Sequence, residues 1–225
     1  MRWAAAAIVL PVTFVLAACQ PARPKGPNAA GLVRLPCGGG ALRPNGVLNC
    51  VDERNYVTPP ALAALQQAAQ TVRTAYPGAA VRYMEASWAS GKRPMPPHLS
   101  HGDGREVDLA LYYETARGSP LGRTPTLDPL GYGAFEPPRT EAERVCKDGA
   151  LGANDAPDPP KTRAWRLDET RTRLLLKTLT ADPRVRRVFI EPHLKARLGF
   201  GGDDKVRFAG CQAARHDDHL HVDFF

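Results

Sequence analysis

The sequence predicts an α+β domain built on a small, mainly antiparallel sheet flanked by helices. Segments with helical periodicity and segments with strand alternation both occur, but they do not alternate strictly, which disfavours a parallel α/β sheet. The 225 residues suffice for one core, and the hydrophobic (43%) and charged (24%) contents are ordinary for a globular protein. The many Pro (22) and Gly (20) residues indicate extensive loops.

The N-terminal segment has the character of an export signal. Arg2 precedes the apolar run Trp3–Ala18, which is too short for a membrane span. The run ends in Leu-Ala-Ala-Cys at Cys19, which resembles a bacterial lipobox. Cys19 would then become a lipidated N-terminus that anchors the protein to a membrane. The alternative is an ordinary signal peptide with an incidental Cys19.

The domain organisation follows from this signal. We expect a signal peptide over residues 1–18, a lipidated N-terminus and flexible tether over 19–31, and the domain over 32–225. Gln20 is not the Asp that resembles an inner-membrane retention signal, so the expected location is periplasmic, with an anchor in the outer membrane.

Four further cysteines, Cys37, Cys50, Cys146 and Cys211, suit disulfides in an exported protein. Three pairings are possible. We favour Cys37 with Cys50, which closes a short Gly-rich loop, and Cys146 with Cys211. A cysteine metal site is disfavoured because the chain has no Cys-x-x-Cys spacing.

The first half of the domain predicts a helix and two strands. The helix begins after Thr58, a candidate N-cap followed by Pro59, and it ends at Pro77-Gly78. Strands are expected over Val81–Trp88 and Arg105–Tyr113. In the second strand Val107, Leu109 and Leu111 alternate with Glu106, Asp108 and Ala110, so that Asp108 faces away from the core.

The long segment Glu114–Lys161 is dense in Gly and Pro and predicts a loop near the site. A loop of this length is a lid or wall of a substrate cleft, or a surface insertion. Tyr132 and Phe135 are its candidate contact residues.

The second half predicts a helix over Leu167–Thr180, a strand over Arg187–Glu191 and a short helix over Pro192–Leu198. The last strand is His219–Phe224. Its residues Leu220, Val222 and Phe224 form a core face, and His219, His221 and Asp223 share the other face.

Five of the six histidines fall in two short clusters, which is unusual for surface or core histidines. The first holds His98 and His101, and the second holds His216, His219 and His221. Two imidazoles and a carboxylate form the ligand set of a catalytic zinc. Asp108 can complete such a set, whereas the isolated His193 is expected to be structural.

Both clusters resemble motifs of one family of zinc peptidases, grouped as lysostaphin, D-Ala-D-Ala metallopeptidase and hedgehog-like. Ser-His-Gly-Asp-Gly-Arg-Glu-Val-Asp (Ser100–Asp108) resembles their His-x6-Asp motif, and His219-Leu-His221 resembles their His-x-His motif. The likeness is strongest to the penicillin-insensitive murein endopeptidase branch. There it extends to the His98–His101 and His216–His221 segments, and to the Val188–Pro192 segment followed by Lys195.

The resemblance implies a site. Zinc would be held by His101, Asp108 and His221, with His98 as a cleft residue and a further candidate ligand. His219 would assist the attacking water or stabilise the oxyanion. His216 would be a second catalytic-cleft residue, and Asp218 would orient an imidazole.

The implied activity is zinc-dependent hydrolysis of the peptide cross-links of peptidoglycan, next to a D-amino acid. A D,D-carboxypeptidase or dipeptidase of the same superfamily is the close alternative, although that branch has Glu where this chain has Asp218. A non-catalytic wall-binding lipoprotein with zinc is the other alternative.

The net charge of +7 and the pI near 9.4 predict an anionic partner. The basic residues form no long run and no interleaved aromatic–basic stretch. We therefore expect cell-wall polymer, with peptidoglycan peptide stems as substrate, and no nucleic acid.

Overall fold

A computed structural model describes residues 26–96, 98–146, 158 and 163–225. The predicted signal peptide and Cys19 lie outside the described residues. Within the described part, Asn28 already contacts the domain, because its side-chain amide donates to the Ala89 carbonyl (2.7 Å).

The central sheet has six strands, and it confirms the predicted mainly antiparallel α+β fold. β4, β5, β10 and β8 form its antiparallel centre, and β2 and β9 join the two edges in parallel. In spatial order the strands are β2 (Leu42–Pro44), β4 (Val81–Tyr83), β5 (Glu106–Ala110), β10 (His219–Phe224), β8 (Val185–Phe189) and β9 (Val206–Arg207).

Two small antiparallel pairs lie outside this sheet. One pairs β1 (Val33–Arg34) with β3 (Tyr56–Val57), and the other pairs β6 (Tyr113–Thr115) with β7 (Trp165–Leu167).

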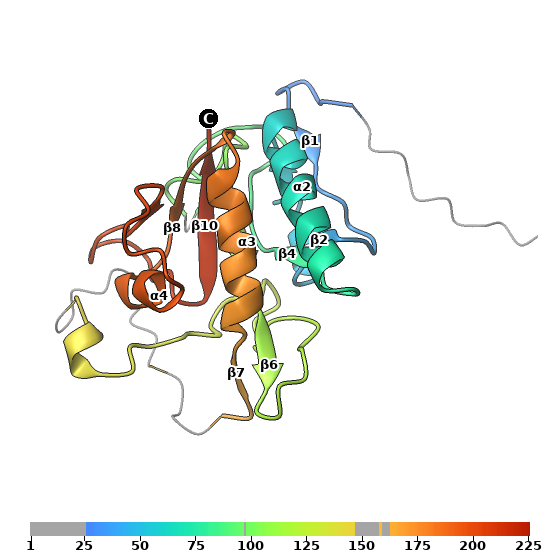
Figure 1. Cartoon of the computed structure of the whole chain (residues 1–225). Coiled ribbons are helices and arrows are strands. Elements are labelled where there is room, and N and C mark those ends of the chain that lie inside the picture. The colour runs from blue at the N-terminus through green and yellow to red at the C-terminus, as the bar shows by residue number, and fades with distance from the viewer. Residues whose placement is uncertain (1–25, 97, 147–157, 159–162) are drawn as a thin grey trace, which may run out of the picture.

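Two long helices cover one face of the sheet. α2 (Pro59–Ala75) begins at Thr58, whose side chain accepts from the Ala61 amide, as the sequence predicts. α3 (Glu169–Ala181) begins at Asp168, whose side chain accepts from the Arg171 amide. The two helices lie side by side in Figure 1 and contact each other.

The remaining helices are short: α1 (Leu48–Val51), α4 (Pro192–Arg197) and the 3-10 helix η1 (Glu141–Glu143). Among the described helices, none combines the length and the apolar composition that crossing a bilayer requires.

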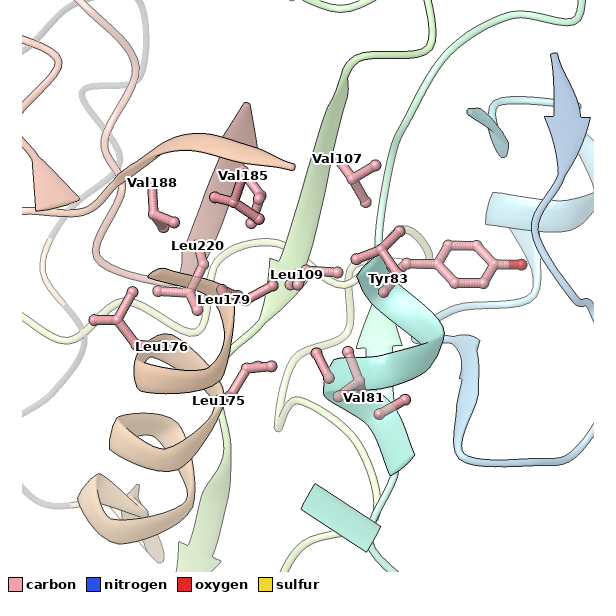
Figure 2. Close-up of a cluster of buried hydrophobic side chains, with 14 of the residues drawn as sticks. Val81, Tyr83, Val107, Leu109, Leu175, Leu176, Leu179, Val185, Val188 and Leu220 are labelled. Carbon is pink, nitrogen blue, oxygen red and sulfur yellow. The ribbon is translucent and has the colours of Figure 1, made fainter. Parts of the chain in front are cut away.

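The core lies between these helices and the sheet. Figure 2 shows Leu175, Leu176 and Leu179 of α3 gathered with side chains of the strands. Val107 and Leu109 of β5 and Leu220 and Val222 of β10 belong to the same buried cluster. Alternation along β5 and β10 therefore sends Asp108, His219 and His221 to the opposite face.

Both favoured disulfides are present. Cys37 is bonded to Cys50, and Cys146 is bonded to Cys211 across 65 residues of sequence.

Several element boundaries differ from the sequence expectations. The predicted strand Val81–Trp88 ends at Tyr83. The strand expected over Arg187–Glu191 lies two residues earlier. The helix expected to begin at Leu167 begins at Glu169 instead, because Asp168 is its N-cap and Leu167 belongs to β7.

Candidate metal centre

The register of β5 against β10 brings the two distant motifs together. His221 is the direct cross-strand partner of Asp108, and His219 is the partner of Ala110. Directly opposed residues on one face of an antiparallel pair lie close enough for their side chains to touch. The sheet thus joins a carboxylate and an imidazole that are 113 residues apart in sequence.

Three side chains converge on one point. His221 Nδ1 lies 2.9 Å from Asp108 Oδ1 and 3.2 Å from His101 Nε2. His101 Nε2 lies 3.3 Å from the same Asp108 oxygen. Two atoms that each bind a tetrahedral zinc at ~2.0–2.1 Å are ~3.3 Å apart. The three atoms therefore have the chemistry and nearly the spacing of ligands to one zinc-sized ion.

His101 is oriented by its own backbone surroundings. Its Nδ1 donates to the Ala86 carbonyl (2.7 Å), and this bond leaves Nε2 free to face Asp108 and His221. Hydrogen bonding at one ring nitrogen is the usual way that a protein aims the other at a metal.

The loop after His101 needs its two glycines. Gly102 and Gly104 both have positive φ (+141° and +82°), and their amides donate to the Ser87 hydroxyl. A Cβ at Gly104 would lie 2.4 Å from a methyl carbon of Leu32. Ser87 and the glycines thus fix the turn between His101 and β5.

Asp218 holds His219 beside the three candidate ligands. Asp218 Oδ1 accepts from His219 Nδ1 (2.5 Å), and Oδ2 accepts from the Gly133 amide (2.6 Å). His219 Nε2 then lies 3.7 Å from Asp108 Oδ1. The arrangement agrees with the expectation that Asp218 orients an imidazole.

Tyr132 of the long loop closes over this cluster. Its hydroxyl donates to Asp108 Oδ2 (2.6 Å). Its ring packs edge-on against His219 and at a tilt against His98. Phe135, the other expected contact residue, packs under the Arg215 guanidinium instead. The Gly- and Pro-rich loop thus contacts the site through Tyr132.

His98 lies at the edge of the cluster. Its Nε2 faces Glu85 Oε2 at 2.7 Å, and Glu85 also binds Arg54. The ligand atoms of His98, His101 and Asp108 lie within 4.8 Å of one another, so this group too could hold a metal ion. The ligand atoms of His101, Asp108 and His221 lie closer together than these do, which favours His221 over His98 as the third ligand.

His216 is buried beside the cluster, with its ring 5.0 Å from that of His219 and 5.6 Å from that of His221. Among the described residues, its Nδ1 has no hydrogen-bond partner. Burial, followed by the neighbouring imidazoles, holds the pKa of His216 well below its usual range. It is a neutral ring that can face a ligand or substrate.

The imidazoles of the cluster differ in the direction in which their pKa values are shifted. Burial opposes protonation of His219, but the Asp108 and Asp218 carboxylates outweigh it and raise its pKa to about 9. Burial lowers the pKa of His221. Burial would raise the pKa of Asp108, but His101 and His219 hold it well below its usual range. The charges suit a neutral ligand at His221, an anionic ligand at Asp108 and a proton donor at His219.

Three contributors were not expected from the sequence: Glu85, Ser87 and the Gly133 amide. Each acts through backbone placement or through another side chain, and no motif marks such a role. His193, expected to be structural, donates from Nε2 to the Glu136 carbonyl (2.6 Å).

The chain matches no protein-family model and no curated protein.

Proposed function

We propose that this protein is a zinc-dependent peptidase that cuts the peptide cross-links of peptidoglycan. The observation that carries the proposal is the convergence of His101 Nε2, Asp108 Oδ1 and His221 Nδ1 within 3.3 Å of one another. Two imidazoles and a carboxylate, with a further imidazole beside them, are the donor set of hydrolytic zinc sites rather than of structural ones. The resemblance of both motifs to murein endopeptidases supplies the substrate class.

The residues have separate tasks. His101, Asp108 and His221 would hold the ion, which when bound lowers the pKa of water and polarises a carbonyl oxygen. His219, held by Asp218, presents Nε2 to the reacting atoms, where it donates a hydrogen bond to developing negative charge or moves a proton.

Tyr132 governs access in this proposal. Its hydroxyl and ring lie against Asp108 and His219, so a peptide carbonyl that approaches the ion from this side must displace the Tyr132 side chain. Its loop is therefore the wall or lid of the cleft.

The carboxypeptidase alternative is disfavoured by the contacts of Asp218. Both of its oxygens are engaged, one with His219 and one with the Gly133 amide. It is therefore placed to position an imidazole rather than to act as a base.

The non-catalytic alternative has one specific observation in its favour. The candidate ligands are almost wholly buried (His101 and Asp108 0% exposed, His221 6%), as in a structural site. If His98 completed the coordination as a fourth protein ligand, the ion would have no position left for water.

One assay separates these functions. Residues 20–225 are incubated with purified cross-linked muropeptides, and the products are separated by chromatography. An endopeptidase releases monomers, a carboxypeptidase releases only terminal D-alanine, and a structural protein leaves the substrate intact. A chelator should abolish the release of monomers.

His219→Gln should keep the metal and slow release by about 10²–10³-fold, the usual range for a lost proton carrier or oxyanion donor. His193→Gln, a change at a buried histidine outside the cluster, should keep the wild-type rate. If His219→Gln is as fast as wild type, the role assigned to His219 is wrong.

A further inference from the structure

A cavity of about 440 Å³, away from the candidate metal centre, is lined by arginines. It lies where the C-terminal end of α2, the segment after β5 and the loop at Pro120–Thr124 meet. None of its lining residues belongs to the candidate metal centre. Its volume falls within the range of small-molecule sites.

Four arginines line this cavity: Arg43, Arg82, Arg123 and Arg171. Only Arg171 has a carboxylate partner, since its Nε lies 3.2 Å from Asp168. Arg82 donates to the Pro44 carbonyl (3.0 Å), a neutral group. Among the described residues, Arg43, Arg82 and Arg123 form no ion pair, and no Asp or Glu lines the cavity.

Arg82 also lies in surroundings that disfavour its charge. Burial, followed by repulsion from Arg43 and Arg123, lowers the pKa of Arg82 to about 10. Arg43 Nε is buried and has no hydrogen-bond partner among the described residues. A buried guanidinium donor without a partner is costly and calls for an acceptor.

We propose that this cavity binds a phosphorylated ligand, with the phosphoryl group against Arg43, Arg82 and Arg123. A phosphate monoester carries ≈ −1.5 to −2 charges and three acceptor oxygens, which suits three guanidinium groups that have no carboxylate partner. A single carboxylate would leave most of their charge uncompensated. Tyr76 and Tyr112, which also line the cavity, offer an apolar wall to the organic part.

Calorimetric titration of residues 20–225 with phenyl phosphate and with benzoate, at equal ionic strength, tests this directly. The two probes share a ring and differ in the anion. The protein is first treated with a chelator, so that phosphate cannot bind through a metal. This makes the outcome independent of the proposed peptidase activity. We expect saturable binding of phenyl phosphate, and benzoate weaker by about tenfold or more.

Arg43→Gln and Arg123→Gln should each weaken phenyl phosphate binding by about tenfold, the effect of losing one charge-assisted contact. Arg207→Gln, which removes the same charge from β9 at the opposite edge of the sheet, should bind as wild type does. Because the pocket arginines repel one another, both pocket variants should unfold at or above the wild-type temperature in phosphate-free buffer.

Three results would overturn the proposal: no saturable binding of phenyl phosphate, equal affinity for benzoate, or unchanged affinity in both pocket variants. If Arg43→Gln fails to fold, the affinity of Arg123→Gln, a change at an exposed residue, decides between the outcomes.

Discussion

Asp108 is a carboxylate buried among several imidazoles. It is fully buried, its Oδ1 faces His101, His219 and His221, and its Oδ2 accepts from Tyr132. An isolated buried carboxylate would be neutralised rather than left charged. The surrounding imidazoles favour the anionic form of this one, as the proposed role of metal ligand requires.

Gly104 shows how tightly the turn before β5 is fitted. Gly104→Ala should destabilise the protein by about 2–3 kcal/mol, because it combines a positive φ with a clash against Leu32. Gly118 has the same φ (+82°), but a Cβ there would have no neighbouring atom closer than 3.9 Å. Gly118→Ala should therefore lose only the cost of the backbone strain, about 1 kcal/mol.

Urea unfolding of both glycine variants measures the difference. Equal losses of stability in the two would show that the contact with Leu32 is unimportant.

Among the helices and strands, the longer ones can be predicted from the sequence and the shortest cannot. α2, α3 and β10 are predicted because each spans enough residues for caps or alternation to stand out. β1, β3 and β9 have two residues each, and such short strands carry no periodicity. Their pairing is decided by tertiary contacts alone.

The same limit applies to the site. His101, Asp108, His219 and His221 lie in motifs, and the structure brings all four together. Glu85 and Ser87 fall just beyond β4, where only the three-dimensional path of the chain gives them a role. The contact of Tyr132 with Asp108 likewise depends on the course of a long loop.

The turn between α3 and β8 provides a pH-dependent contact. Asp182 accepts three hydrogen bonds from Arg184, and these bonds lower the pKa of Asp182. A lowered folded-state pKa gives stability that is present above the ordinary value of 3.8 and is lost as the pH falls below it.

Asp182→Asn should therefore lose roughly 1 kcal/mol at neutral pH, because solvent weakens these partly exposed bonds. The difference from wild type should shrink as the pH falls below 3.8. Denaturant unfolding over a pH series measures it, and a pH-independent difference would show that the Asp182 charge plays no part.

At the scale of the whole molecule, the fold is tied together by contacts between distant segments. One disulfide joins residues 65 apart, and the candidate metal centre joins His101 to His221, 120 residues apart. Part of the net charge of +7 is concentrated in one cavity, which is lined by three arginines that have no carboxylate partner among the described residues. Those arginines come from three separate segments of the chain, so the sequence alone does not predict their cavity.

The proposed zinc site requires both motifs to share one ion. The most direct test is the zinc bound per chain at a fixed, buffered free zinc concentration, in wild type, His101→Ala, His221→Ala and the control His193→Ala. Wild type and His193→Ala should bind about one zinc, and both ligand variants should bind almost none. One zinc per chain in His221→Ala would contradict this site. The ion would then be held by the first motif, with His98, and not between β5 and β10.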